Sequence, residues 1–137
     1  MKKIIFILTF TLFIYNANAA CDDPIGDGVD YSKCRFSDGQ DLAGSYLPNS
    51  NLSFANFIQV NFDKSTMMNS ILAFGTFSES SFIRANLYES NLQGANFEQS
   101  NFTSSNLTRA NFQGATLIGA NFKNSNLMEA DFTSANI

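Results

Sequence analysis

Large apolar residues recur at every fifth position from Leu42 to Ile137, through twenty consecutive positions. A step of five residues does not suit an α-helix, because it turns by about 140° and spreads these positions around the helix. It does not suit a flat strand either, because an odd step places alternate members on opposite faces. The period instead predicts a backbone that turns a corner after each five-residue unit and sends every fifth side chain, which we call the centre residue, to a central axis.

The identity of the centre residues indicates how many units complete one coil. Residues one coil apart stack directly in a solenoid, so like side chains should recur at the coil length. Identity recurs in 10 of 16 pairs separated by twenty residues, against 5 of 17 pairs separated by fifteen. We therefore expect four units per coil, about five coils over residues 40–137, and aromatic ladders such as Phe62, Phe82, Phe102 and Phe122.

The positions before each centre residue fit the same geometry. Two positions before it, 17 of 20 residues are Ala or Ser, because this side chain shares a narrow interior with the large one. One position before it, 12 of 20 residues are Asn and two are Asp. These residues accept tight bends and hydrogen-bond to nearby backbone or to the Asn one coil away.

Units such as Ala85-Asn86-Leu87 and Ala120-Asn121-Phe122 match the repeat A-(D/N)-(L/F)-x-x of the pentapeptide-repeat family, which this chain resembles over residues 40–137. The resemblance implies an all-β fold, a right-handed quadrilateral β-helix. It is weakly specific for function, because one fold carries many activities.

Residues 1–19 have the order of a secretory signal peptide. Lys2 and Lys3 precede an apolar run from Ile4 to Tyr15, and small residues follow up to Ala19. We expect cleavage after Ala19 and export to the periplasm or the extracellular space. The apolar run is too short for a retained transmembrane span, and no later segment is long enough to be one.

Residues 20–39 contain both cysteines and are predicted to form an N-terminal cap. In an exported chain, Cys21 and Cys34 most simply form one disulfide. A cap is needed because the first coil exposes an apolar cross-section and unpaired strand edges. The segment also looks like the leader that precedes the coils in exported members of the family. In the alternative interpretation, Ala19-Ala20-Cys21 is a lipoprotein box, and Cys21 anchors an envelope lipoprotein through its lipid.

The last unit of the sequence stops at a centre residue, Ile137, with no segment to cover the final coil. Either that coil frays or two molecules stack end to end and bury the cross-section. The sequence therefore predicts a possible end-to-end homodimer through the C-terminal coil.

The chain is poor in residues that perform chemistry. It has no His and no Trp, and the predicted disulfide uses both Cys, so catalytic triads and imidazole metal sites are not built. The Asp residues at 22, 23, 27 and 30 lack the spacing of a calcium loop. We expect no enzyme activity, no cofactor and no metal site.

The charge of the chain bears on one alternative function. Some members of the family act as DNA mimics on DNA gyrase, and that role needs a dense negative field. From residue 40 onward the chain has seven acidic and four basic residues. This charge is sparse, so a DNA-mimic modulator of gyrase or topoisomerase is kept only as an alternative, and no nucleic-acid partner is expected.

The outward positions of the first coils are unusually apolar: they include Tyr46, Phe54, Met68, Ile71, Phe74 and Ile83. Phe54 and Phe74 are twenty residues apart and should stack on one side, with Ile71 nearby. In one interpretation the cap folds over these residues, using Val29, Tyr31 or Phe36. In the other, Phe54, Ile71 and Phe74 form a partner-binding patch. Together these features predict a non-enzymatic exported scaffold for an unknown protein partner.

Overall fold

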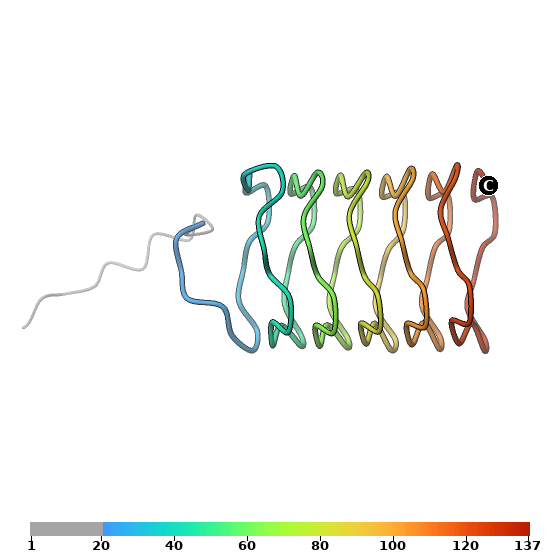
Figure 1. Cartoon of the computed structure of the whole chain (residues 1–137), viewed down its shortest axis with the longest axis horizontal. Helices are drawn as coiled ribbons and strands as arrows, with labels where there is room; N and C mark the ends of the chain where they lie inside the picture. Colours follow the sequence, from blue (N-terminus) through green and yellow to red (C-terminus); the bar gives the residue numbers. More distant parts are fainter. Residues whose placement is uncertain (1–20) are drawn as a thin grey trace, which may run out of the picture.

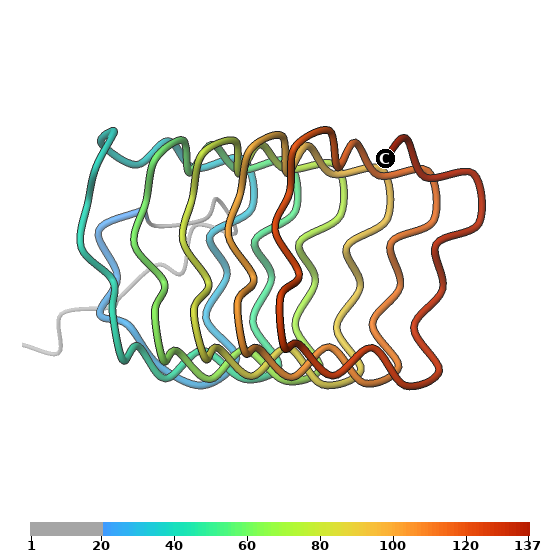
Figure 2. The same ribbon diagram turned by 45° about the vertical axis from the view of Figure 1, so that its right-hand side comes forward.

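The computed structural model describes residues 21–137, which wind into a solenoid with its coils stacked along one axis (Figure 1). The described N-terminal residues lie at one end of the stack and the C-terminus at the other, and the outline of the coil repeats along it (Figure 2). Within these residues the backbone forms no helix and no extended strand; each unit contributes one isolated parallel β-bridge. The predicted repeat solenoid is confirmed, whereas the predicted signal peptide over residues 1–19 lies outside the described residues.

The bridges fix the register between coils. From Asp41 paired with Asn61 to Thr116 paired with Asn136, every bridge joins residues twenty apart. The twenty-residue interval predicted from the centre residues is therefore correct. The bridging residue is always the one before a centre residue. Each unit therefore lies beside the unit twenty residues away, with equivalent positions next to each other.

The core is a column of centre residues along the solenoid axis. Leu47, Phe57 and Phe82 are fully buried, as are most other centre residues as far as Phe112. The rings of Phe62 and Phe82 stack with their centroids 5.1 Å apart, and those of Phe82 and Phe102 stack at 4.9 Å. Burial of a side chain of this size contributes about 1.5–3 kcal/mol each, so this column is the main source of stability.

Each corner combines a short turn with a left-handed residue. In the unit of Leu42, the Ser45 amide donates to the Leu42 carbonyl at 3.1 Å, and Gly44 between them has a φ of 69°. The side-chain oxygen of the Asn before a centre residue accepts the amide two residues on, as Asn61 does from Asp63 at 2.9 Å. These local bonds explain why small, Asn and turn-tolerant residues recur at fixed positions.

The solenoid pairing begins inside the segment predicted to be a cap. Asp30 bridges Asn51, and Arg35 bridges Asn56, so the interval here is twenty-one residues instead of twenty. The extra residue lies between Phe36 and Gln40, where the Gln40 amide donates to the Ser37 carbonyl at 3.1 Å. Residues 36–40 thus contain one extra residue. The insertion interrupts the five-residue period, but the solenoid pairing continues on both sides of it.

No helix in residues 21–137 is both long and apolar enough to cross a membrane.

Candidate functional site: an exposed aromatic corner

The three predicted patch residues lie together on one side of the solenoid. Phe54 and Phe74 occupy the same corner of successive coils, and Ile71 lies in the unit that contains Phe74 and is bridged to Asn51 in the unit that contains Phe54. Their exposed fractions are 58%, 53% and 44% in the order Phe54, Phe74, Ile71. We call Phe54, Ile71 and Phe74 the aromatic corner.

The two rings of the aromatic corner stack on each other and on the next coil. Their centroids lie 5.3 Å apart with an interplanar angle of 17°. The ring of Phe74 in turn lies over Gly94, the equivalent residue one coil on, where a Cβ atom would come within 2.6 Å of Phe74 Cε1. The two rings and Gly94 therefore follow one another along the same corner of three successive coils.

The backbone of the aromatic corner is costly for the residues it carries. Phe54 and Phe74 both have a φ of 59°, in the left-handed region that disfavours bulky L-residues by about 1–2 kcal/mol. At this position every other described unit from residue 44 onward has Gly or a polar residue, such as Asn49, Lys64 or Gly94. The exposed rings thus sit where neither backbone preference nor burial favours them.

The cap does not cover the aromatic corner, so the interpretation that Val29, Tyr31 or Phe36 covers it is wrong. Tyr31 and Phe36 are themselves centre residues of the first coil, 2% and 9% exposed, and Phe36 stacks on Phe57 at 4.3 Å. Val29 packs against the core, and its carbonyl accepts the Asn51 amide at 2.9 Å. The solenoid repeat continues through Tyr31 and Phe36, so their side chains point into the core. The aromatic corner is therefore left open to solvent.

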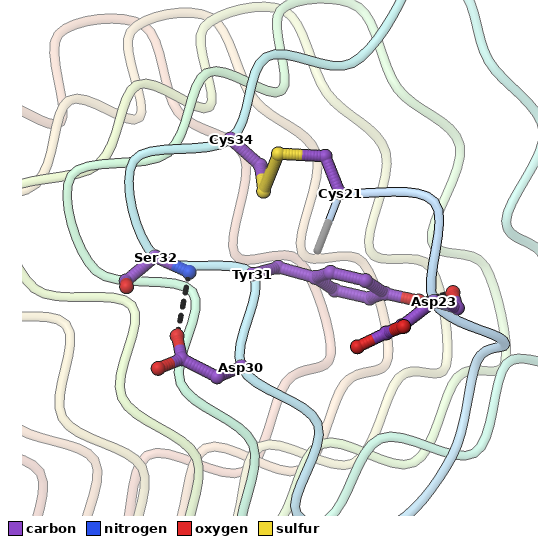
Figure 3. The surroundings of a disulfide bond; sticks show 6 residues. All are labelled: Cys21, Asp23, Asp30, Tyr31, Ser32 and Cys34. Carbon is purple, nitrogen blue, oxygen red and sulfur yellow. Dashed lines mark hydrogen bonds between the residues drawn. A yellow bond between two sulfur atoms is a disulfide. The ribbon is translucent and has the colours of Figure 1, made fainter. Parts of the chain in front are cut away.

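Within the segment predicted to be a cap, residues 21–25 are fastened to the first coil by a disulfide and by a hydrogen bond from the Tyr31 hydroxyl (Figure 3). Cys34 occupies the small inward position of its unit, is 2% exposed, and is bonded to Cys21 with their Cα atoms 5.5 Å apart. The Tyr31 hydroxyl donates to the Asp23 carbonyl at 2.6 Å. Burial raises the pKa of Tyr31, and the nearby charge of Asp23 raises it further.

The single-residue insertion and the inward Tyr31 and Phe36 were missed from the sequence. The signal was available, because Tyr31, Phe36 and Leu42 follow one another at intervals of five and six residues. A search for apolar residues at exact intervals of five ends at Leu42. A search that allows one extra residue extends the repeat to Phe36 and Tyr31.

The main charged cluster lies on another corner, nearer the C-terminal end. Arg109 donates to Glu89 at 3.0 Å in one neighbouring coil and to Glu129 at 2.7 Å in the other. Its guanidinium also donates to the Tyr88 hydroxyl at 3.2 Å. The hydrogen bond from Arg109 lowers the pKa of Glu89, and that with Tyr88 lowers it further. All three ion-pair partners are about half-exposed, so this cluster contributes little stability.

Apolar groups are also exposed at the C-terminal end, where Leu127 and Ile137 are 36% and 80% exposed. End-to-end dimerisation through this end stays a prediction. Within residues 21–137, no three His, Cys, Asp or Glu side chains gather in a way that could hold a metal ion.

Comparison with known proteins places the repeats in a family. The family model described as pentapeptide repeats matches in 8 copies, over residues 41–73, 72–104, 80–116 and 105–137. No curated protein matches the chain in sequence.

Solved structures of pentapeptide repeat proteins are similar to this chain. One is Rfr23 from the cyanobacterium Cyanothece 51142, with 25% identity and a TM-score of 0.50, covering 70% of this chain and 63% of that one. Another is HetL from Nostoc sp. strain PCC 7120, a protein involved in the regulation of heterocyst differentiation. It has 19% identity and a TM-score of 0.52, covering 82% of this chain and 62% of that one. The chain thus spans less than two thirds of the length of either protein, and the likeness to HetL bears on the fold alone.

Proposed function

This chain belongs to the pentapeptide-repeat family, and from that premise we propose that it is a non-enzymatic exported scaffold that binds a protein partner through the aromatic corner. The proposal includes a right-handed solenoid of about five coils, as the family resemblance and the twenty-residue register imply. The observation that carries the binding role is the exposed, stacked pair of Phe54 and Phe74 in left-handed backbone conformation.

The energetic argument for a binding role is that both rings are disfavoured in the isolated protein. Each Phe residue leaves more than half of its surface in water, and each backbone is in a region that Gly or Asn adopts more easily. A contact with a partner buries the apolar surface and offsets both costs, because burial contributes about 25 cal/mol per Å². Exposed apolar clusters of this kind mark interaction sites.

The surroundings of the aromatic corner favour a protein surface as the ligand. Ile71, in the unit that contains Phe74, is 44% exposed and adds apolar surface on the same side as the two rings. Asn51 and Ser53 lie in the same unit as Phe54 and supply a polar rim. An apolar centre with a polar rim is the usual composition of a protein–protein interface.

The disulfide supports the exported location. Cys34 is buried and bonded to Cys21, and disulfides of this kind persist in oxidising compartments. N-terminal sequencing of the protein recovered from periplasmic and external fractions tests the location and the cleavage after Ala19. Recovery only from the cytosol with Met1 retained would remove this part of the proposal.

The two alternative functions lack comparable support. A lipid on the Cys21 sulfur competes with the disulfide to Cys34, and the mass of the mature protein distinguishes the two forms. For DNA mimicry, the pairing of Arg109 with Glu89 and Glu129 reduces the negative field on that corner. Gyrase supercoiling assays with the purified protein test that alternative directly.

The test of the binding role is a double substitution, Phe54→Asn with Phe74→Asn. Asn tolerates a left-handed backbone, so we expect unchanged or higher stability together with loss of a partner that crosslinks to the wild-type protein in envelope fractions. The matched control is Gln59→Asn with Glu79→Asn, because these residues occupy the next corner of the same coils, with φ of 58° each. Equal capture of every partner by the double variant would exclude the aromatic corner as the binding surface.

A further inference from the structure

A basic residue lies at one end of the aromatic corner. The Lys33 amide donates to the Ser53 carbonyl at 2.9 Å, as the Phe54 amide does to the Ala73 carbonyl at 3.0 Å in the next coil. Lys33 has a φ of 62°, close to the 59° of Phe54. Lys33 therefore occupies the position of Phe54 one coil earlier, displaced along the solenoid axis by one strand spacing, about 4.8 Å.

A second basic residue, Arg35, lies on the side of the coil that follows this corner. Arg35 is bridged to Asn56, in the unit that follows the corner of Phe54. Cys34, between the two basic residues, is 2% exposed and disulfide-bonded, so the backbone that carries both side chains is held in place. Lys33 and Arg35 are themselves exposed.

The two basic side chains have no partner of opposite charge. Both ion pairs within residues 21–137 belong to Arg109. Asp30 lies in the same coil as the two basic residues, but its Oδ1 accepts the Ser32 amide at 2.9 Å (Figure 3). Residues 1–20 contain no Asp or Glu. Both cationic groups are therefore available to an anionic group of a ligand.

The positive charge lies at one end of the ring stack. Beyond Phe74 the same corner continues with Gly94, Gly114 and Ser134, which are uncharged. The residue just before each corner position from Phe54 onward is uncharged as well: Ser53, Ala73, Gln93, Gln113 and Thr133. A ligand that lies along the corner is therefore oriented, with its acidic part next to Lys33 and its apolar part over the two rings.

We propose that the aromatic corner binds a segment of a partner protein in which Asp or Glu residues lie beside an apolar or aromatic residue. This inference rests on the binding role proposed above and specifies the chemistry of the partner. The apolar side chain contacts Phe54 and Phe74, while the carboxylates lie near Lys33 and Arg35. A guanidinium pairs with a carboxylate through two parallel hydrogen bonds, which adds specificity to the charge attraction.

The probes are three acetylated and amidated hexapeptides that differ in their first two residues: Glu-Glu-Gly-Phe-Ile-Phe and its Gln-Gln and Lys-Lys counterparts. NMR titration of the disulfide-bonded protein follows the ring protons of Phe54 and Phe74 and the amides of Ser53 and Ala73. We expect the Glu peptide to saturate these shifts at about 1 mM or below, and the Gln peptide to bind about two- to tenfold more weakly. The Lys peptide should bind more weakly still, and added salt should reduce the difference between the Glu and Gln peptides.

The protein variant that tests the charge is Lys33→Gln with Arg35→Asn. Gln adopts the same left-handed backbone at Gln59 and Gln99, and Asn is the commonest residue before a centre residue, so we expect an intact fold. This variant should bind the Glu peptide only as strongly as the wild type binds the Gln peptide.

The matched control is Lys64→Gln with Arg84→Gln. These residues also have left-handed backbones and lie two corners after Phe54 and Phe74, so the control removes the same charge from a different side of the solenoid. It should bind the Glu peptide as the wild type does. Equal weakening in this control would overturn the inference, because the effect would then come from net charge instead of from Lys33.

The remaining outcomes separate this inference from the binding role on which it rests. Equal binding of the three peptides, lost in Phe54→Asn with Phe74→Asn, would overturn the preference for acidic segments and leave the aromatic corner as a binding surface. Undiminished binding of a Glu peptide with Gly in place of its apolar residues would also overturn the inference, because charge alone would then suffice. Absence of any ring shift with all peptides would count against both the inference and the binding role.

Discussion

The ring of Phe74 rests directly on Gly94, with Phe74 Cδ1 only 2.7 Å and Cε1 only 2.6 Å from the place where a Cβ would stand. Gly94 therefore has two structural roles. It adopts the left-handed φ of 64° that the corner requires, and its lack of a side chain leaves room for the Phe74 ring. The aromatic corner thus depends on a residue that is not itself aromatic.

Substitution of Gly94 by Ala should displace the Phe74 ring and disrupt its stacking on Phe54. The matched control is Gly114→Ala, because Gly114 has a φ of 66° and no atom within 4 Å of its Cβ position. Both variants should lose about 1 kcal/mol of unfolding free energy from the left-handed backbone, and Gly94→Ala about 0.5–1 kcal/mol more from the lost ring contacts. Urea unfolding and ring contacts measured by NMR check this; equal stability with an unmoved ring would contradict it.

Gly75 occupies a position where most units have Ala or Ser, and Gly75→Ala should be destabilising by about 1–3 kcal/mol. A Cβ there would lie 2.6 Å from Phe77 Cε2 and 3.2 Å from the Ala55 and Leu72 carbonyl oxygens. Ala55 and Ala95 at the equivalent positions show that the backbone accepts a side chain. If Phe77 causes the cost, Gly75→Ala should be milder in a Phe77→Leu background, and an unchanged cost in that double-mutant cycle would shift the cause to the carbonyls.

Removing the disulfide with Cys21→Ser and Cys34→Ala should lower the unfolding free energy by about 3 kcal/mol, because the bridge closes a loop with a sequence separation of 13. Ala is chosen at 34 because it fits the small inward position. Hydrogen exchange should accelerate first in residues 21–36, while the amides of the central coils keep their protection. A uniform acceleration over all coils would show that the cap controls the whole solenoid instead of its first coil.

Alkaline pH should weaken the attachment of the cap through Tyr31. Its pKa is raised above 10.0 in the folded protein, so the phenol is favoured in its protonated state. Its contribution is complete below the unfolded pKa and is lost as pH rises through the higher folded pKa. Thermal unfolding from pH 8 to 11 should show a steeper loss in wild type than in Tyr31→Phe, whose side chain does not titrate; parallel curves would exclude Tyr31 as the source.

Acid should weaken the cluster around Arg109. The pKa of Glu89 is lowered from 4.5 by the hydrogen bonds with Arg109 and Tyr88, so its contribution is present above that value and is lost as pH falls through the lower folded pKa. In Arg109→Gln, the melting temperature should therefore fall less steeply with decreasing pH than in the wild type. The effect of salt on this fall should also be lost. An acid limb that is identical in the variant would assign it to other carboxylates. The absolute change at neutral pH should be small because the cluster is exposed.

The sequence predicted the interior well because the interior repeats. The interval of twenty residues, the inward Phe ladders and the small residues beside them all follow from a volume limit that every unit shares. The stacking of Phe54 on Phe74 followed from the same interval.

The features that the sequence did not predict depend on local geometry. The insertion near Phe36 breaks the period by one residue, and Tyr31 then joins the core instead of covering Phe54. The contact of Phe74 with Gly94 depends on a side-chain rotamer, which no spacing rule specifies. The hollow between residues 21–25 and the side chains of Tyr31, Phe36 and Leu42 lies where no repeat constrains the backbone, so the sequence did not predict it.

The constant register has a consequence for how such a molecule changes length. A block of twenty residues inserted between Tyr46 and Phe54 would return the chain to the same side and leave every neighbouring contact type intact. It would separate the disulfide of Cys21 and Cys34 from the aromatic corner by one further strand spacing, about 4.8 Å. Duplication or deletion of whole coils would therefore change the distance between the disulfide-bonded end and the aromatic corner in steps of one strand spacing, without changing the residues at either place.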